Sequence, residues 1–291
     1  MISIIITTYK RPMNVLQRAL NTAYSQTVKD KEIILVNDYP PYESDILNLI
    51  KNYCDIKFIS HKKNEGACKS RNDGIHIASG EYIAFLDDDD EWDNEKLARQ
   101  LEVIVSEKAD MVYCSGVRLF PNGKIEDMPF IRGYDDNLCQ HLLAGNFMGG
   151  CSFPLIKKTV LLSVHGFDEE LPSSQDYDLW IRIARQYKVV FLNEPLVLYH
   201  VENASISSSL DRRLQGYAMV LNKHIALFKK YPVEMSSYIY NMARTALIYS
   251  RWDAYFSVFM NSFNCFPRNL KIVWLGIEMF ARSVVKRFRR K

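Results

Sequence analysis

Four aspartates stand in succession at Asp87 to Asp90, directly after the apolar run 82–86. Adjacent carboxylates repel one another, and a cation at this place would relieve that cost. Hard divalent ions such as Mg²⁺ and Mn²⁺ take one or two carboxylates and complete their coordination with water and phosphate oxygens. The alternative is a solvated acidic turn before a helix that starts near Asn94, because Asp93 and Asn94 are favourable N-cap residues.

The acidic run belongs to a first half in which β-rich stretches alternate with helical periodicity. Strands are expected at 2–7, 32–38, 56–60, 82–87 and 111–120, and helices at 12–26, 44–53, 67–78 and 95–107. This alternation predicts an α/β fold with a mostly parallel central sheet and helices on both faces. Ligands of such sheets bind beyond the carboxyl ends of the strands. The candidates are therefore the polar residues that end the strands, namely Thr7, Thr8, Tyr9, Asn37, Asp38 and Asp87 to Asp90.

The composition changes along the chain. Residues 1–211 contain 31 acidic and 22 basic residues, whereas residues 212–291 contain three acidic and 15 basic residues, a net charge of +12. Helical periodicity continues from about residue 211 to the end, while residues 121–170 are expected to be irregular. These features predict a domain over residues 1–210 and a basic helical appendage over residues 211–291.

Four segments connect the candidates to a known family. They are SIIITTYKRP, EIILVNDY, NEGACKSRNDGIHIASGEYIAFLDDDD and GFDEELPSSQDYDLWIRIAR, in this order along the chain. Together, over roughly residues 1–210, they resemble the family-2 glycosyltransferases of the GT-A fold. The resemblance implies a Rossmann-like GT-A catalytic domain, a nucleotide-sugar donor and Mn²⁺ or Mg²⁺ as cofactor.

The same resemblance implies which residues bind the nucleotide. Thr7 and Tyr9 would line the base pocket, with the Tyr9 ring stacked on a pyrimidine. Asp38 would accept a hydrogen bond from N3 of the base, which uracil and thymine offer and cytosine does not, so UDP or dTDP is the expected carrier. Arg71 would pair with nucleotide phosphate. The open alternatives are a turn role for Asp38 and a helix-surface ion pair for Arg71.

The acidic run matches the DxD motif of the family. By this match Asp89 is the metal ligand, and Asp87 and Asp88 lie near the ribose and the metal-bound water. The later segment LVLYHVENASIS resembles the place where the family often carries a histidine close to the metal or diphosphate. The candidates there are Glu202 and His200, with a structural role as the alternative for the histidine.

Asp176 matches the catalytic base of the family. A carboxylate that takes the proton of the acceptor hydroxyl as the new bond forms contributes about 10²- to 10⁴-fold to the rate. Direct displacement would invert the anomeric carbon. Gln175 and Asn37 depart from the family pattern, which usually has an acidic residue at both positions. The structural alternative is that Asp176 caps the N-terminus of a helix, a role that is compatible with catalysis.

The acceptor side is expected in the segment NFMGGCS, residues 146–152. Gly149 and Gly150 would allow close approach of the backbone to a ligand, and Trp180 is a further candidate for acceptor binding. An ordinary loop is the alternative. The expected acceptor is a glycan or a lipid-linked sugar.

Residues 270–291 combine a helical apolar stripe with the basic end KRFRRK. One hypothesis is peripheral contact with the inner face of the cytoplasmic membrane, since basic amphipathic helices lie in anionic headgroups. The other is that the stripe packs on preceding helices or in a homo-oligomer. No nucleic-acid motif accompanies the charge. Scattered cysteines and the lack of a signal-peptide pattern favour a cytoplasmic protein.

The resemblance carried by the four segments implies a metal-dependent, inverting glycosyltransferase of the hexosyltransferase type. It would move a sugar from a UDP- or dTDP-sugar to an acceptor hydroxyl, in the assembly of a bacterial-type surface polysaccharide or glycolipid. The alternative from another class is a catalytically silent nucleotide-binding scaffold of the same fold. The departures from the family pattern at Asn37, Gln175 and Glu202 motivate that alternative.

Overall fold

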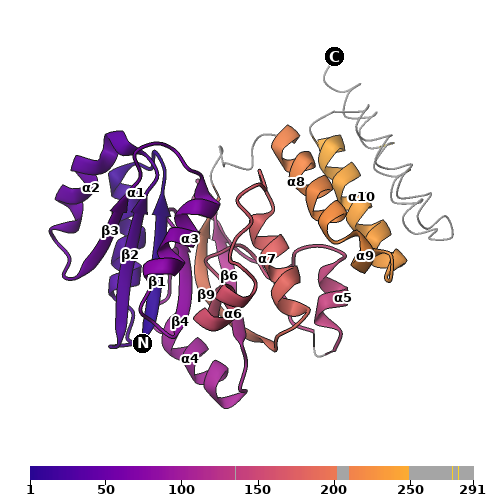
Figure 1. The fold of residues 1–291 in the computed structure, drawn as a ribbon, viewed down its shortest axis with the longest axis horizontal. Helices are drawn as coiled ribbons and strands as arrows, with labels where there is room; N and C mark the ends of the chain where they lie inside the picture. Colours follow the sequence, from indigo (N-terminus) through magenta and orange to yellow (C-terminus); the bar gives the residue numbers. More distant parts are fainter. Residues whose placement is uncertain (135, 202–209, 249–276, 278–280, 282–291) are drawn as a thin grey trace. The chain divides into compact units, whose positions relative to one another are not determined.

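The computed structural model describes residues 1–134, 136–201 and 210–248, together with residues 277 and 281. The chain divides into two compact units. The first comprises Met1–Asp136, Phe147–Glu170 and Gln175–Asn203, and the second comprises Asn137–Asn146, Leu171–Ser174 and Ala204–Lys291. The first unit contains a nine-stranded sheet, and the described part of the second contains helices (Figure 1). The division between residues 210 and 211 stays a prediction.

Parallel strands build the N-terminal half of the sheet. β1 (Ile2–Thr8), β2 (Lys31–Asn37), β3 (Ile56–Ser60) and β4 (Tyr82–Asp87) pair in the spatial order β3-β2-β1-β4. β1 is almost wholly buried, as expected of a parallel strand that is covered on both faces. The strands predicted here are confirmed to within one residue at each end, because runs rich in apolar residues mark them.

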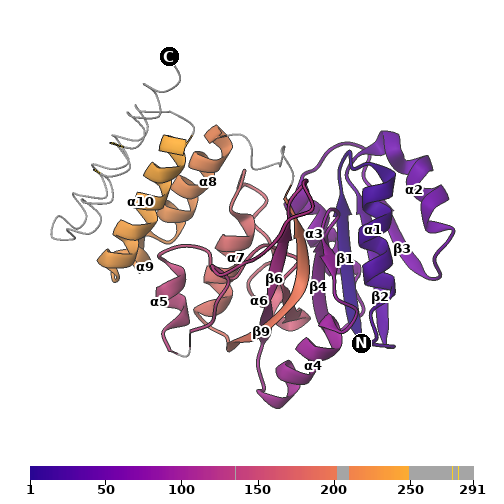
Figure 2. The ribbon, with the colours of Figure 1, turned by 180° about the vertical axis from the view of Figure 1, so that it is seen from behind.

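The helices between these strands cover both faces of the sheet. α1 (Met13–Tyr24) and α2 (Glu43–Ile50) follow strands that advance in one direction across the sheet, whereas α3 (Ala67–Ile77) connects β3 back to β4. Because crossovers of this kind are right-handed, α3 lies on the face opposite α1 and α2; Figures 1 and 2 view the two faces. Gly74 brings α3 close to β1, since a Cβ there would lie 2.5 Å from Cγ2 of Ile5.

The second half of the sheet is mixed. β8 (Pro154–Lys157) runs antiparallel between β4 and β6 (Met111–Leu119), and β9 (Val189–His200) pairs in parallel with β6. The short strands β5 (Glu91–Trp92) and β7 (Ile125–Asp127) and the helices α4 (Lys96–Ser106), α6 (Lys158–Ser163) and α7 (Gln175–Ala184) complete the unit. Most of the described part of 121–170 is irregular, as predicted, but β7, β8, α6 and one further short helix lie within it. They were missed because strands of three or four residues are too short to show a period.

The carboxyl ends of β1, β2 and β4 meet at one edge of the sheet. In the strand register Thr7 stands beside Asp87, and Thr8 stands beside Asn37. The polar residues selected from the sequence therefore lie next to one another across three strands. This is the edge at which ligands of open α/β sheets bind.

The second unit is described over four helices. They are α5 (Leu138–Leu142), α8 (Leu210–Lys223), α9 (Ile225–Phe228) and α10 (Pro232–Ile248). Gln140 donates a hydrogen bond of 2.8 Å to Glu234, and Asn241 donates one of 2.9 Å to the carbonyl of Ala144. Across the part of the chain that the structure describes, no helix has the length and apolar character to span a membrane. The predicted amphipathic tail at 270–291 lies outside the described residues.

Candidate active site

The acidic run continues β4 into a tight turn, and its four carboxylates alternate in exposure. Asp87 and Asp89 keep part of their side chains in contact with solvent, whereas Asp88 and Asp90 are buried. Asp88 and Asp89 form the turn, which is closed by a hydrogen bond of 3.1 Å from the N–H of Asp90 to the carbonyl of Asp87 and leaves Asp88 and Asp90 buried. A solvated acidic turn, the alternative raised by the sequence, does not describe two buried aspartates.

Arginines from two other elements neutralise the first three aspartates. Nη2 of Arg71 on α3 lies 2.8 Å from Oδ1 of Asp87. Nε of Arg11 lies 2.8 Å from Oδ1 of Asp88, and its Nη2 lies 2.8 Å from Oδ2 of Asp89. Burial raises the pKa of Asp88 in spite of the opposing charge of Arg11. The run is therefore held by cations of the protein itself, which offsets much of its mutual repulsion.

Asp90, to which the sequence analysis gave no role, anchors the opposite loop. Its Oδ2 accepts a hydrogen bond of 2.6 Å from Oγ of Ser152, and the same Oγ accepts one of 3.1 Å from the backbone N–H of Asp87. Burial raises the pKa of Asp90 well above its usual value, and the negative charges of Asp87 and Asp89 act in the same direction. Through Ser152, Asp90 therefore positions the loop after Gly150.

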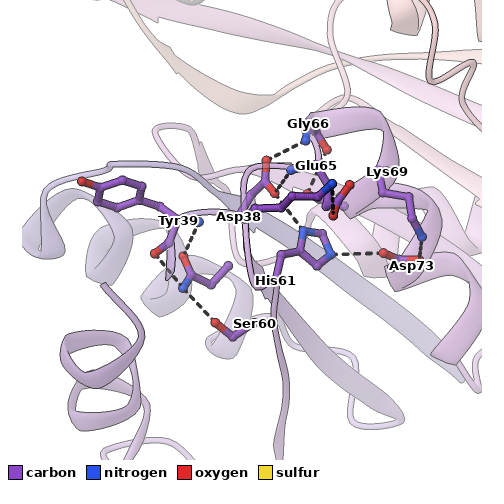
Figure 3. A network of polar contacts seen from close by, with 11 residues as sticks. Asp38, Tyr39, Ser60, His61, Glu65, Gly66, Lys69 and Asp73 are labelled. Carbon is purple, nitrogen blue, oxygen red and sulfur yellow. Dashed lines mark hydrogen bonds and ion pairs between the residues drawn. The ribbon is translucent and has the colours of Figure 1, made fainter. Parts of the chain in front are cut away.

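Asp38 is buried at the end of β2, where its carboxylate binds the loop before α3 (Figure 3). Oδ1 accepts a hydrogen bond of 2.7 Å from the N–H of Glu65, and Oδ2 accepts one of 2.8 Å from the N–H of Gly66. Nδ1 of His61 lies 2.8 Å from Oδ1. A carboxylate has about four lone-pair positions, so these contacts leave room for one more donor. The role of Asp38 toward the base N3 stays a prediction.

His61 extends this network to α3. Its Nε2 lies 3.1 Å from Oδ2 of Asp73, which is also paired with Lys69 one helical turn earlier (Figure 3). Both ring nitrogens thus face carboxylates, and the ring links Asp38 at the end of β2 to Asp73 on α3. The network fixes the N-terminus of α3, the helix that carries Arg71. Nothing in the local sequence around His61 indicates this contact, because its partners are 23 and 12 residues away.

Tyr9 presents an exposed ring at the end of β1. It meets Tyr39 edge to face, with 5.5 Å between ring centroids, and Nζ of Lys10 lies 5.2 Å from the Tyr9 centroid and 5.1 Å from that of Tyr39. Hydrogen bonds to Asn64 and then to Lys10 lower the pKa of the Tyr9 hydroxyl. Thr7, the half-buried penultimate residue of the same strand, stands beside Asp87. This surface is aromatic and cationic, and Tyr39 and Lys10 were not foreseen as parts of it.

Asp176 lies in the first turn of α7, where its carboxylate is close to the acidic run. Its Oδ1 accepts a hydrogen bond of 2.8 Å from the N–H of Tyr177. Burial raises the pKa of Asp176 to about 6, against the Tyr177 N–H and Arg71, which lower it, and together with Asp87, which raises it. The predicted base and the Arg71–Asp87 pair are therefore electrostatic neighbours.

Gly149 and Gly150 form the loop that faces the end of β4. A Cβ on Gly150 would lie 3.9 Å from Oδ2 of Asp87. The carbonyl of Gly149 accepts a hydrogen bond of 3.2 Å from Nε1 of Trp180. The indole of Trp180 has no exposed surface, so it supports this loop from behind, and the prediction of direct acceptor contact by Trp180 needs correction.

The close packing of this loop yields a stability prediction. Gly149→Ala is expected to lower the free energy of unfolding more than Gly123→Ala. Both glycines have left-handed backbones, with φ of +83° and +80°, which costs about 1–2 kcal/mol for alanine. Only at Gly149 would the new Cβ meet a side chain, 2.7 Å from Cδ2 of Phe153, and overpacking adds about 1–3 kcal/mol. Urea unfolding measures both variants, and equal losses would contradict this account.

His200 and Glu202 were the two predicted candidates for a further metal ligand. Nε2 of His200, at the end of β9, lies 2.6 Å from Oε1 of Glu91, and Nε of Arg18 lies 3.1 Å from the same oxygen. His200 therefore lies beside the acidic turn, engaged with Glu91. Glu202 lies outside the described residues.

Comparison with known proteins decides the family. Residues 3–155, more than half of the chain, match the model described as glycosyl transferase family 2. The chain belongs to glycosyl transferase family 2. Within that family it is 31% identical over 215 residues to an uncharacterized glycosyltransferase of Methanocaldococcus jannaschii, covering 70% of this chain and 71% of that protein. It is 28% identical over 216 residues to the amylovoran biosynthesis glycosyltransferase AmsB of Erwinia amylovora, covering 68% and 69%.

Solved structures confirm the GT-A fold of this family 2 glycosyltransferase. S. aureus TarS 1-349 in complex with UDP-GlcNAc superposes with a TM-score of 0.62 at 14% identity, covering 92% of this chain and 91% of that chain. The mannosyltransferase PcManGT of Pyrobaculum calidifontis, in complex with GDP-Man and Mn²⁺, gives 0.58 at 15% identity, covering 100% and 87%. The predicted α/β sheet with a helical C-terminal region is thereby confirmed.

The residues of the acidic run fit a divalent cation. The guanidinium of Arg11 already brings positive charge to the carboxylates of Asp88 and Asp89, and hard oxygen ligands suit Mg²⁺ or Mn²⁺. Within the described part of the chain, no three or more His, Cys, Asp and Glu side chains are already gathered to hold a metal. Ions of this kind need only one or two carboxylates when phosphates and water complete the coordination.

Proposed function

We propose that this glycosyltransferase is an inverting, metal-dependent enzyme that transfers a sugar, of the hexosyl type, from a UDP- or dTDP-sugar to an acceptor hydroxyl. The observation that carries the proposal is the convergence on Asp87. Arg71 pairs with this carboxylate, Gly150 of the acceptor loop lies against it, and Asp176 responds to its charge. A phosphate-binding cation, an open loop and a candidate base thus surround one position.

The proposed roles follow from the chemistry of each group. Asp176 accepts the proton of the acceptor hydroxyl as that oxygen attacks the anomeric carbon, and displacement from the opposite side inverts the centre. Arg71 binds the diphosphate and stabilises the charge that develops on it as it leaves. A divalent cation held by Asp89, with Asp87 and Asp88 near the ribose, supplies Lewis acidity to the same diphosphate when bound. A contribution from Glu202 or His200 to that site remains part of the proposal.

A pyrimidine is the proposed base. The exposed Tyr9 ring offers a stacking surface beside Thr7, and base stacking on an aromatic ring is worth about 1–3 kcal/mol. Asp38 supplies the predicted acceptor for N3. Of the two structures with the same fold, TarS was solved with UDP-GlcNAc and PcManGT with GDP-Man. The base therefore has to be tested directly.

For the acceptor we propose a glycan or a lipid-linked sugar in surface polysaccharide or glycolipid assembly. The name of the Erwinia relative, an amylovoran biosynthesis glycosyltransferase, supports a polysaccharide. Gly149 and Gly150 are the proposed acceptor loop. A cytoplasmic location with peripheral membrane contact through residues 270–291, and formation of a homo-oligomer, belong to the same proposal.

A thermal-shift panel of UDP-, dTDP- and GDP-sugars, with and without Mn²⁺, tests base, sugar and metal together. Binding at 100-fold excess over the dissociation constant stabilises by about 2.7 kcal/mol, which is about 5–10 °C for a protein of this size. UDP- or dTDP-sugars should give the larger shift, and Mn²⁺ should increase that shift. A response to GDP-sugars alone would overturn the base assignment.

In the same panel Asp89→Ala should abolish the Mn²⁺ dependence of the nucleotide shift. Asp127→Ala is the matched control, because this exposed aspartate of β7 lies outside the acidic run. An unchanged Mn²⁺ response of Asp89→Ala would contradict the metal role. If sugar nucleotides bind but neither transfer nor donor hydrolysis follows, the silent scaffold becomes the better account.

A further inference from the structure

The segment after β1 places Arg11 across two carboxylates of the acidic run. Nε bonds Asp88 and Nη2 bonds Asp89, each at 2.8 Å. The Arg11 side chain is only 16% exposed, so this double contact is well shielded from water. Guanidinium groups in this geometry bind carboxylates tightly, and they bind phosphates in the same way.

The backbone holds Arg11 in this position. Lys10 has a positive φ of 54°, a conformation that costs a non-glycine residue energy and often marks a functional segment. Pro12 restricts Arg11 to extended backbone. The turn therefore directs the guanidinium back over the end of β4, and the same turn carries Tyr9, the proposed base-stacking residue.

We propose that Arg11 and the divalent cation compete for the carboxylate of Asp89, and that the donor diphosphate ends this competition by binding the guanidinium of Arg11 in place of Asp88 and Asp89. The inference rests on the proposed metal and nucleotide site. Arg11 contacts Oδ2 of Asp89, the proposed metal ligand, and Oδ1 of the neighbouring Asp88, and a guanidinium and a divalent ion on the same carboxylate repel one another. The incoming diphosphate is an anion that a guanidinium binds equally well.

This exchange couples three events at the site. In the free protein Arg11 keeps the carboxylates paired and lowers their affinity for metal. When Arg11 turns to the diphosphate, Asp89 is released to the cation and Asp88 to the ribose and the metal-bound water, and movement of the Tyr9–Arg11 turn adjusts the base-stacking ring. The affinity for the metal thus depends on bound nucleotide in two ways. The phosphates serve as metal ligands, and they also draw Arg11 away from its carboxylates.

The test is a titration of Mn²⁺ alone, followed by electron paramagnetic resonance of free Mn²⁺, on the full chain. Arg11→Gln should bind Mn²⁺ about tenfold more tightly than the wild type. Arg11→Lys, which keeps the charge without the fork, should lie between them. Arg18→Gln is the matched control, because Arg18 bonds the backbone carbonyl of Asp89 at 2.9 Å and Glu91 at 3.1 Å.

A second titration with saturating UDP completes the design. The increase in Mn²⁺ affinity caused by UDP should be smaller in Arg11→Gln than in the wild type, and metal-free UDP binding should weaken in this variant. Equal or weaker Mn²⁺ binding by Arg11→Gln without nucleotide, or no binding at all, would overturn the competition. Thermal melting verifies that each variant is folded. If Arg11→Gln does not fold, the Mn²⁺ affinity of Arg11→Lys relative to the wild type provides the test. Failure of the proposed function would appear elsewhere, as no response to any sugar nucleotide.

Discussion

Asp176→Asn is expected to lower kcat by about 10²- to 10⁴-fold while leaving the affinity for UDP nearly unchanged. The amide has almost the shape of the carboxylate, but it cannot take a proton from the acceptor hydroxyl. Steady-state transfer assays give kcat, and calorimetric titration of UDP with Mn²⁺ gives the affinity. A variant that keeps more than a tenth of the wild-type rate would disprove the base assignment.

The half-buried position of Asp176 adds a pH dependence. Because burial raises the pKa of this carboxyl to about 6, the fraction of ionised base falls as the pH drops below that value. The rate should therefore decline toward acid through pH 6, and the decline should be missing from the residual rate of Asp176→Asn. The sign for stability is opposite, since a carboxyl with a raised pKa favours the folded state at low pH and loses that contribution as the pH rises toward 6.

Asp178→Asn is the matched control on the same helix. Asp178 is fully buried, and its Oδ2 accepts a hydrogen bond of 2.8 Å from Nε of Arg182. Breaking a buried pair by removing one partner costs about 3–5 kcal/mol, so this variant should melt at a lower temperature and keep kcat while folded. Asp176→Asn should do the reverse. If both variants lost only stability, Asp176 would be a structural residue of α7.

The sequence predicted the strand ends correctly because apolar runs of β1, β2 and β4 stop at polar residues. From that alone Asp38 and Asp87 could be assigned to one edge of the sheet, and the register confirms that their strands end together. The insertion of β8 between β4 and β6 could not be predicted, since a four-residue antiparallel strand carries no periodic signal and its partners are distant in sequence.

The side chains that the site residues contact were harder to predict than the positions of those residues at the strand ends. Asp90 reads as one more aspartate of an acidic run, yet it is buried and binds Ser152, 62 residues away. Arg11 reads as the basic end of a loop, and only the left-handed Lys10 turns it onto Asp88 and Asp89. Burial and backbone reversal are properties of the folded chain, and residue spacing does not encode them directly.

Arg71→Gln is the second large effect, with an expected loss of about 10²- to 10³-fold in kcat and weaker UDP binding. Arg71 lies on α3, where its guanidinium pairs with Asp87 and lies 5.4 Å from the centroid of the Phe167 ring. Both contacts fix its plane, and a preorganised donor aimed at developing charge is worth about 10²- to 10³-fold when it is removed. Arg71→Lys should recover only part of the loss, because an ammonium lacks the two-pronged geometry.

The control is the same substitution at an arginine that is paired away from the strand edge. Nη2 of Arg99 on α4 lies 2.8 Å from Oε1 of Glu194, and the Arg99 side chain is 43% exposed. Surface pairs of this kind contribute about 0–1 kcal/mol, so Arg99→Gln should leave both kcat and UDP affinity intact. Arg71→Gln also exposes Asp87 as an unpaired charge, and melting curves separate that loss of stability from the loss of rate. If the folded Arg71→Gln enzyme behaved like Arg99→Gln, the arginine would be a structural counter-ion of Asp87 and phosphate binding would have to come from elsewhere at this edge.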